Sequence, residues 1–80
     1  MMNVILDARK LDEKDSAHEY LKDIFSFPEY YGCNLDALYD CLSEMEPLNI
    51  YIIHTEESKN YFPKVLSVFE DLSDAAICLK

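Results

Sequence analysis

The sequence has little glycine and no tryptophan, with Gly32 as its one glycine in 80 residues. A nucleotide-binding loop needs several glycines at the start of a helix, so a single glycine excludes that class of site. We expect the backbone of Gly32 to take a positive φ, which a β-carbon would resist, and so to form a rigid turn.

Basic residues are also few, because 7 Lys and Arg stand against 16 Asp and Glu, which leaves a net charge of −9. Such a surface repels the phosphates of nucleic acids and of anionic membranes. The charge balance therefore argues against both as partners and favours a basic protein.

The three cysteines, Cys33, Cys41 and Cys78, have neither paired nor metal-ligand spacing. No basic region or signal-length apolar run begins the sequence, and no stretch approaches the roughly 20 apolar residues of a membrane span. We expect a reduced, soluble, cytoplasmic protein without a cofactor, folded as one domain over residues 1–80. Cys41 and Cys78 are read as small core residues.

Hydrophobic spacing predicts six main elements. In chain order they are a strand at 4–6, a helix at 17–25, a helix from 35 to between 44 and 47, a strand at 49–54, a helix from 61 to 72 and a strand at 75–79. A single helical turn is expected in 55–60. This order, β-α-α-β-α-β, predicts an α/β fold with a small three-stranded parallel sheet and helical crossovers.

Local signals refine two of these elements. Ser16 and Glu19 have the spacing of a capping box, which predicts that the first helix begins at Ala17. The strand at 49–54 is apolar at consecutive positions, which is typical of a strand covered on both faces.

The second helix is the most informative element. Asn34 is placed to cap it, and its spacing puts Leu38 and Leu42 on a core side. Asp36 and Asp40 lie on the other side, one turn apart, where they repel each other by roughly 0.2–0.5 kcal/mol. The pair is therefore interpreted either as part of a solvated acidic face or as a surface that meets positive charge.

The stretch from 27 to 42 also carries a resemblance. It reads Pro28-Glu29-Tyr30-Tyr31-Gly32, one residue, Asn34-Leu35-Asp36-Ala37-Leu38, an aromatic at 39, and Asp40-Cys41-Leu42. This pattern resembles the barstar family of intracellular inhibitors of secreted, barnase-like ribonucleases. Elsewhere the similarity is limited to the order of the elements and to residues 65–71.

The resemblance implies the same α/β fold and a non-enzymatic function, in which the chain binds a guanyl-specific ribonuclease as a monomer in a 1:1 complex. Asp40 would occupy the catalytic phosphate position and pair with the enzyme's arginines and histidine. Asp36 would meet a neighbouring basic group. The full set of implied contact residues is Tyr30, Gly32, Asn34, Asp36, Tyr39, Asp40, Ser43 and Asp71.

The chain departs from the family at several of these positions. Tyr39 replaces a common tryptophan, Cys33 replaces an acidic residue, and Glu44-Met45 replace glycine and tryptophan. The segment from 54 to 63 is shorter. An acidic module that neutralises another basic toxin is therefore a second hypothesis.

Two further chemistries are weaker alternatives. Asp36 and Asp40 have the spacing to share a magnesium ion in a metal-dependent hydrolase, but no third ligand is evident from spacing, and Asp71 or Glu44 is left as the candidate. His18 and His54 have no ligand spacing and are expected at the surface or its boundary. Cys33 has no histidine or basic residue nearby in sequence to activate it as a nucleophile. Tyr30 and Tyr39 are expected at an interface, and Tyr31 in the core.

Overall fold

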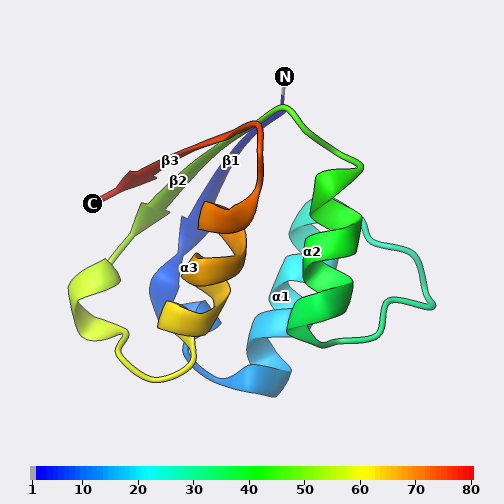
Figure 1. The fold of residues 1–80 in the computed structure, drawn as a ribbon. Helices are drawn as coiled ribbons and strands as arrows, with labels where there is room; N and C mark the ends of the chain where they lie inside the picture. Colours follow the sequence, from blue (N-terminus) through cyan, green and yellow to red (C-terminus); the bar gives the residue numbers. More distant parts are fainter. Residues whose placement is uncertain (1) are drawn as a thin grey trace.

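Three parallel strands and three α-helices make up the fold (Figure 1). The computed structural model describes residues 2–80. The elements are β1 (Met2–Asp7), a 3-10 turn η1 (Ala8–Leu11), α1 (Lys14–Phe25), α2 (Leu35–Ser43), β2 (Leu48–Ile53), a 3-10 turn η2 (Thr55–Glu57), α3 (Phe62–Asp71) and β3 (Ala75–Leu79). The predicted β-α-α-β-α-β order and the helical turn in 55–60 are confirmed.

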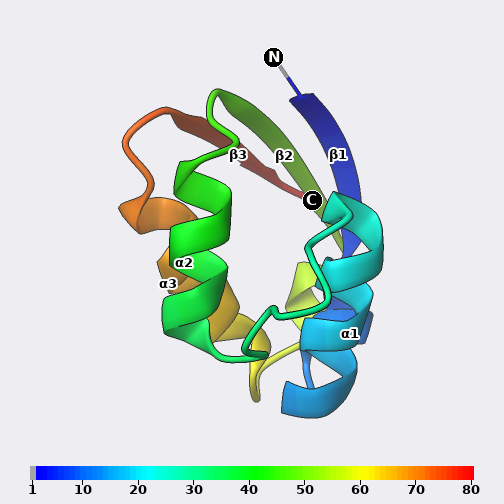
Figure 2. The ribbon, with the colours of Figure 1, turned by 90° about the vertical axis from the view of Figure 1, so that its right-hand side faces the viewer.

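The strands are ordered β1-β2-β3, so each crossover moves the chain one strand further in the same direction. Crossovers of one hand that advance in one direction place their helices on the same face of the sheet. The helices accordingly gather on one side, with the strands along the other (Figure 2). The core lies between these two layers.

The prediction that the strand at 49–54 is covered on both faces is wrong. Burial alternates along β2, with Ile50 and Ile52 buried and Tyr51 exposed. Tyr51 pairs with Ile5 of β1, which is 68% exposed on the same open face. The consecutive apolar residues of β2 therefore reflect an uncovered apolar sheet face.

The first helix begins three residues before the predicted start, and the proposed capping box is wrong. Its N-cap is Glu13, whose side chain makes no capping hydrogen bond, so Ser16 and Glu19 lie inside the helix. The Ala17 amide donates to the Glu13 carbonyl at 2.8 Å, which is an ordinary helical bond. The preceding η1 turn buries Leu11 and leads the chain directly into the helix.

Both later helices bury the predicted faces. Leu38 and Leu42 of α2 are fully buried, as are Val65 and Phe69 of α3. The helices α2 and α3 pack together over the sheet and run in the same direction (Figures 1 and 2). Their C-terminal ends therefore lie at the same end of the molecule.

Of the helices that the structure describes between residues 2 and 80, none combines the length and the apolar character needed to cross a membrane.

Candidate functional site

The site predicted from sequence is built on α2, whose start is fixed by Asn34. The Asn34 Oδ1 atom accepts a hydrogen bond from the Ala37 amide at 2.7 Å, which confirms the predicted cap. Asp36, Tyr39 and Asp40 are exposed. The predicted division into a buried and a presented side is confirmed, and the presented side carries both carboxylates.

The loop before α2 contains the turn, but the prediction of a positive φ at Gly32 is wrong. No glycine has a positive φ, whereas the next residue, Cys33, has a φ of 52°. A β-carbon added to Gly32 would lie 3.2 Å from Asn34 Nδ2 and 3.5 Å from the Ala37 β-carbon. Glycine therefore fits here because it lets the loop approach the start of α2 closely.

Aromatic side chains anchor this loop to the core. The rings of Phe25 and Phe27 are stacked with centroids 5.5 Å apart, and the rings of Phe27 and Tyr31 lie 4.7 Å apart. All three residues are buried, whereas Tyr30 is 87% exposed. The loop is thus held by its neighbours while Tyr30 is presented to solvent, as the sequence predicted for both tyrosines.

Two hydrogen bonds of the buried His18 side chain connect the same loop to α1 and to the start of α3. His18 Nδ1 lies 2.7 Å from the Tyr31 hydroxyl, and His18 Nε2 lies 2.7 Å from the Tyr61 hydroxyl. His18 is 1% exposed, so the prediction that it lies at the surface or boundary is wrong. His54, by contrast, is exposed as predicted.

The environment of these hydrogen bonds favours uncharged groups. Burial, with a smaller contribution from Lys14, holds the pKa of His18 below its ordinary value. Burial likewise raises the pKa of the Tyr31 and Tyr61 hydroxyls. A neutral imidazole between two neutral phenols therefore connects α1, the loop and the start of α3.

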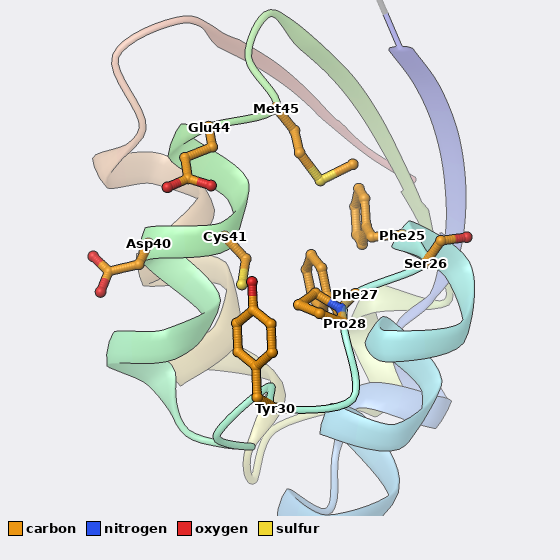
Figure 3. A pocket seen from close by; sticks show the side chains of 9 residues that line it. All are labelled: Phe25, Ser26, Phe27, Pro28, Tyr30, Asp40, Cys41, Glu44 and Met45. Atoms are coloured by element: carbon orange, nitrogen blue, oxygen red, sulfur yellow. The ribbon is translucent and has the colours of Figure 1, made fainter.

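A pocket of about 460 Å³ opens between this loop and α2 (Figure 3). Phe25, Phe27 and Pro28 line its loop side, and Cys41 and Met45 project into it from the helix and its end. The other lining residues are Ser26, Tyr30, Asp40 and Glu44. The pocket is therefore largely apolar, with two acidic residues along its α2 side.

The structure places most of the predicted contact residues on one surface. Gly32 and Asn34 are joined by a 3.3 Å hydrogen bond at the start of α2, and Tyr30 and Asp40 line the same pocket. Ser43 is exposed in the last turn of α2, where its hydroxyl donates to the Asp40 carbonyl at 2.9 Å. The remaining predicted residues are Asp36 and Tyr39 on the exposed side of α2, and Asp71, which ends α3.

Sequence reasoning named Glu44 only as a candidate metal ligand, and it included neither Glu44 nor Met45 among the contact residues. Glu44 follows Asp40 by four positions, as Asp40 follows Asp36, so the spacing already indicated a third acidic residue on this face. No comparable signal marked Met45 or Phe25, because their place in the pocket depends on how the loop folds back against α2.

The alternative chemistries gain no further ligand or base from the structure. Within residues 2–80, no three His, Cys, Asp or Glu side chains converge as a metal site, so Asp36 and Asp40 have no third ligand there. The Cys33 thiol is exposed and donates a 3.7 Å hydrogen bond to the Tyr31 carbonyl. Both nitrogens of His18 are engaged with tyrosines rather than with this thiol.

Comparison with known proteins identifies a family model and a named relative. Residues 1–77 match a family model described as barstar (barnase inhibitor). One relative, "Putative ribonuclease inhibitor YrdF" of Bacillus subtilis (strain 168), is 36% identical over an alignment 80 positions long, and the alignment covers 92% of this chain and 88% of that protein.

Proposed function

The chain belongs to the barstar family, and from that premise we propose that it inhibits a barnase-like, guanyl-specific ribonuclease by covering the enzyme's basic active site. The contact surface would consist of the loop from 27 to 34 and the exposed side of α2. The chain itself would catalyse no reaction.

The observation that carries this proposal is the presented acidic side of α2. Asp36 and Asp40 are both exposed, and the two ion pairs found within residues 2–80, Arg9–Asp7 and Lys22–Glu29, leave both of them unpaired. Four residues of helix separate these carboxylates by about 6 Å along the axis. They repel each other in the free protein, and a cationic partner relieves that repulsion.

The mechanism follows from the chemistry of ribonucleases, whose active sites hold phosphates and are therefore basic. Carboxylates about 6 Å apart present anions on a similar scale to neighbouring phosphates. Asp40 would take the position of the catalytic phosphate, and Asp36 would pair with an adjacent cation. Tyr30, which is 87% exposed, would supply contact area at the edge of the same surface.

Size and charge are compatible with a monomeric inhibitor in a 1:1 complex. The accessible surface of the chain is 4859 Å², and a standard interface takes about 800 Å² per partner. The loop and α2 would thus contribute about a sixth of the surface. A net charge of −9 would raise the rate of association with a basic enzyme. This rate would fall as added salt screens the charges.

We place this activity in the cytoplasm of a cell that makes the ribonuclease. All three cysteines are free thiols, the state that a reducing compartment maintains. An inhibitor there would protect the cell's own RNA until the enzyme is exported.

The experiment is inhibition of purified barnase-like ribonuclease by the purified chain, titrated at low and moderate salt. We expect inhibition at one inhibitor per enzyme, weakened by salt. Asp40→Asn keeps the shape of the side chain but removes its charge, and should weaken binding by roughly 2–5 kcal/mol, or about 30- to 5000-fold.

Glu56→Gln is the matched control. It removes one negative charge from an exposed residue of η2, which lies on the other side of α3 from α2 (Figure 1). This variant should inhibit like the parent chain apart from a small change in association rate. Full-strength inhibition by Asp40→Asn would contradict the mechanism, and no inhibition by the folded parent chain would direct the search to another basic toxin.

A further inference from the structure

The pocket between the loop and α2 adjoins the proposed contact surface. Met45 points across it toward Phe25, and Cys41 points into it from α2 (Figure 3). Its volume of about 460 Å³ is within the usual range of small-molecule pockets, roughly 300–1,000 Å³. A partner docked on α2 would therefore face a cavity large enough for one of its side chains.

The charged residues that line this pocket are all acidic. Asp40 of α2 and Glu44, the C-cap of α2, contribute to its lining, with their carboxylates directed away from the loop side of the pocket (Figure 3), and none of the nine lining residues is basic. Both acids are exposed, and neither belongs to the ion pairs found within residues 2–80. The pocket thus combines an apolar interior with a negative rim.

We propose that this pocket receives an arginine side chain of the bound ribonuclease and that Glu44 is a specificity-determining residue for it. This inference rests on the proposed function, because the arginine belongs to that partner. The methylene stem of the arginine would lie against Phe27 and Met45. The guanidinium would remain at the rim, where it pairs with the Glu44 carboxylate beside Asp40.

Arginine fits this combination because its two ends have different chemistry. Its stem is apolar and can be buried while the charged head stays near water. The planar guanidinium also stacks on aromatic rings and binds carboxylates through two parallel hydrogen bonds, neither of which a lysine ammonium can match. Tyr30, which lines the pocket and is 87% exposed, supplies such a ring.

The test uses three probes on the isotope-labelled chain, followed by amide NMR. The probes are N-acetyl-arginine methylamide, its uncharged analogue N-acetyl-citrulline methylamide, and N-acetyl-phenylalanine methylamide. We expect the arginine compound to bind in the millimolar range and to shift the amides of Phe27, Cys41 and Met45. Glu44→Gln should weaken this binding about fivefold, whereas Glu56→Gln should leave it within about twofold.

Several results would overturn the assignment. These are no shift at the pocket, equal shifts from the arginine and citrulline compounds, stronger binding of the phenylalanine compound, or an unchanged response in Glu44→Gln. Each variant's amide spectrum also reports whether it is folded, and Glu44 is exposed, so its replacement should be tolerated.

The ribonuclease assay separates this inference from the proposed function. Arginine binding that depends on Glu44, in a chain that inhibits no barnase-like enzyme, would support the pocket assignment and remove the proposed target. Inhibition that is lost in Asp40→Asn but unchanged in Glu44→Gln would support the proposed target and contradict the pocket assignment.

Discussion

The buried chain of hydrogen bonds through His18 makes a sharp prediction about stability. Tyr31→Phe removes only a hydroxyl, which lies 2.7 Å from His18 Nδ1. Because His18 is 1% exposed, no bulk water replaces the lost partner, and the ring nitrogen is left unsatisfied. The variant loses both a hydrogen bond and the compensation for burying that nitrogen.

The expected cost follows from the two contributions. A buried polar atom left without a partner costs about 1–3 kcal/mol, so we expect Tyr31→Phe to lower the free energy of unfolding by about 2 kcal/mol. In a domain of this size each 1 kcal/mol lowers the melting temperature by about 4–8 °C. The melting temperature should therefore fall by about 8–16 °C.

The assay is urea and thermal unfolding followed by circular dichroism, with Tyr30→Phe as the control. Tyr30 is the preceding residue in the same loop but is 87% exposed, so its variant should match the parent chain within about 0.5 kcal/mol. Equal stability of Tyr31→Phe and the parent chain would refute the argument. Equal losses in the two variants would also refute it, because the effect would then belong to the loop in general.

The remaining predictions concern the pH dependence of stability and the start of α2. Burial lowers the pKa of His18 in the folded state, whereas in the unfolded chain this histidine has its ordinary pKa of about 6.5. Below that pH the unfolded chain therefore binds more protons than the folded chain. The contribution of His18 to the free energy of unfolding should be full above about pH 6.5 and should be lost as the pH falls through the folded-state pKa. Urea unfolding between about pH 7.5 and about pH 5 should show this loss, and His18→Gln should flatten it; an unchanged pH profile would contradict the assignment. Asn34→Ala removes the 2.7 Å cap of the Ala37 amide and should cost about 0.5–2 kcal/mol in urea unfolding. Gly32→Ala, which meets no positive φ, should change stability by less than about 1 kcal/mol, and a larger loss would show that the close approach to α2 cannot relax.

Hydrophobic spacing was enough to predict the order of the elements and the buried side of α2. Leu38 and Leu42 are fully buried because helical geometry brings residues four apart onto one face, whatever surrounds the helix. The Asn34 cap was also predictable, because its hydrogen bond joins two residues only three positions apart in sequence, Asn34 and Ala37.

Features that depend on distant parts of the chain were not predictable in this way. Tyr51 and Ile50 are both apolar, and only the course of the crossovers shows which of them faces the helices. His18 is buried because Tyr31 and Tyr61, 13 and 43 residues away in sequence, converge on its ring. No local pattern in the sequence predicts that these three side chains meet.

The same convergence bears on the proposed binding, because it determines how firmly the proposed contact surface is held before a partner arrives. Tyr31 is fixed to α1 through His18 and packs on Phe27, while Asn34 ties the end of the loop to α2. Ordering a loop on binding costs free energy that reduces affinity, and this loop is ordered in advance by buried contacts. Presentation of Tyr30 and the acidic side of α2 therefore depends in part on His18, a buried residue outside the proposed contact surface.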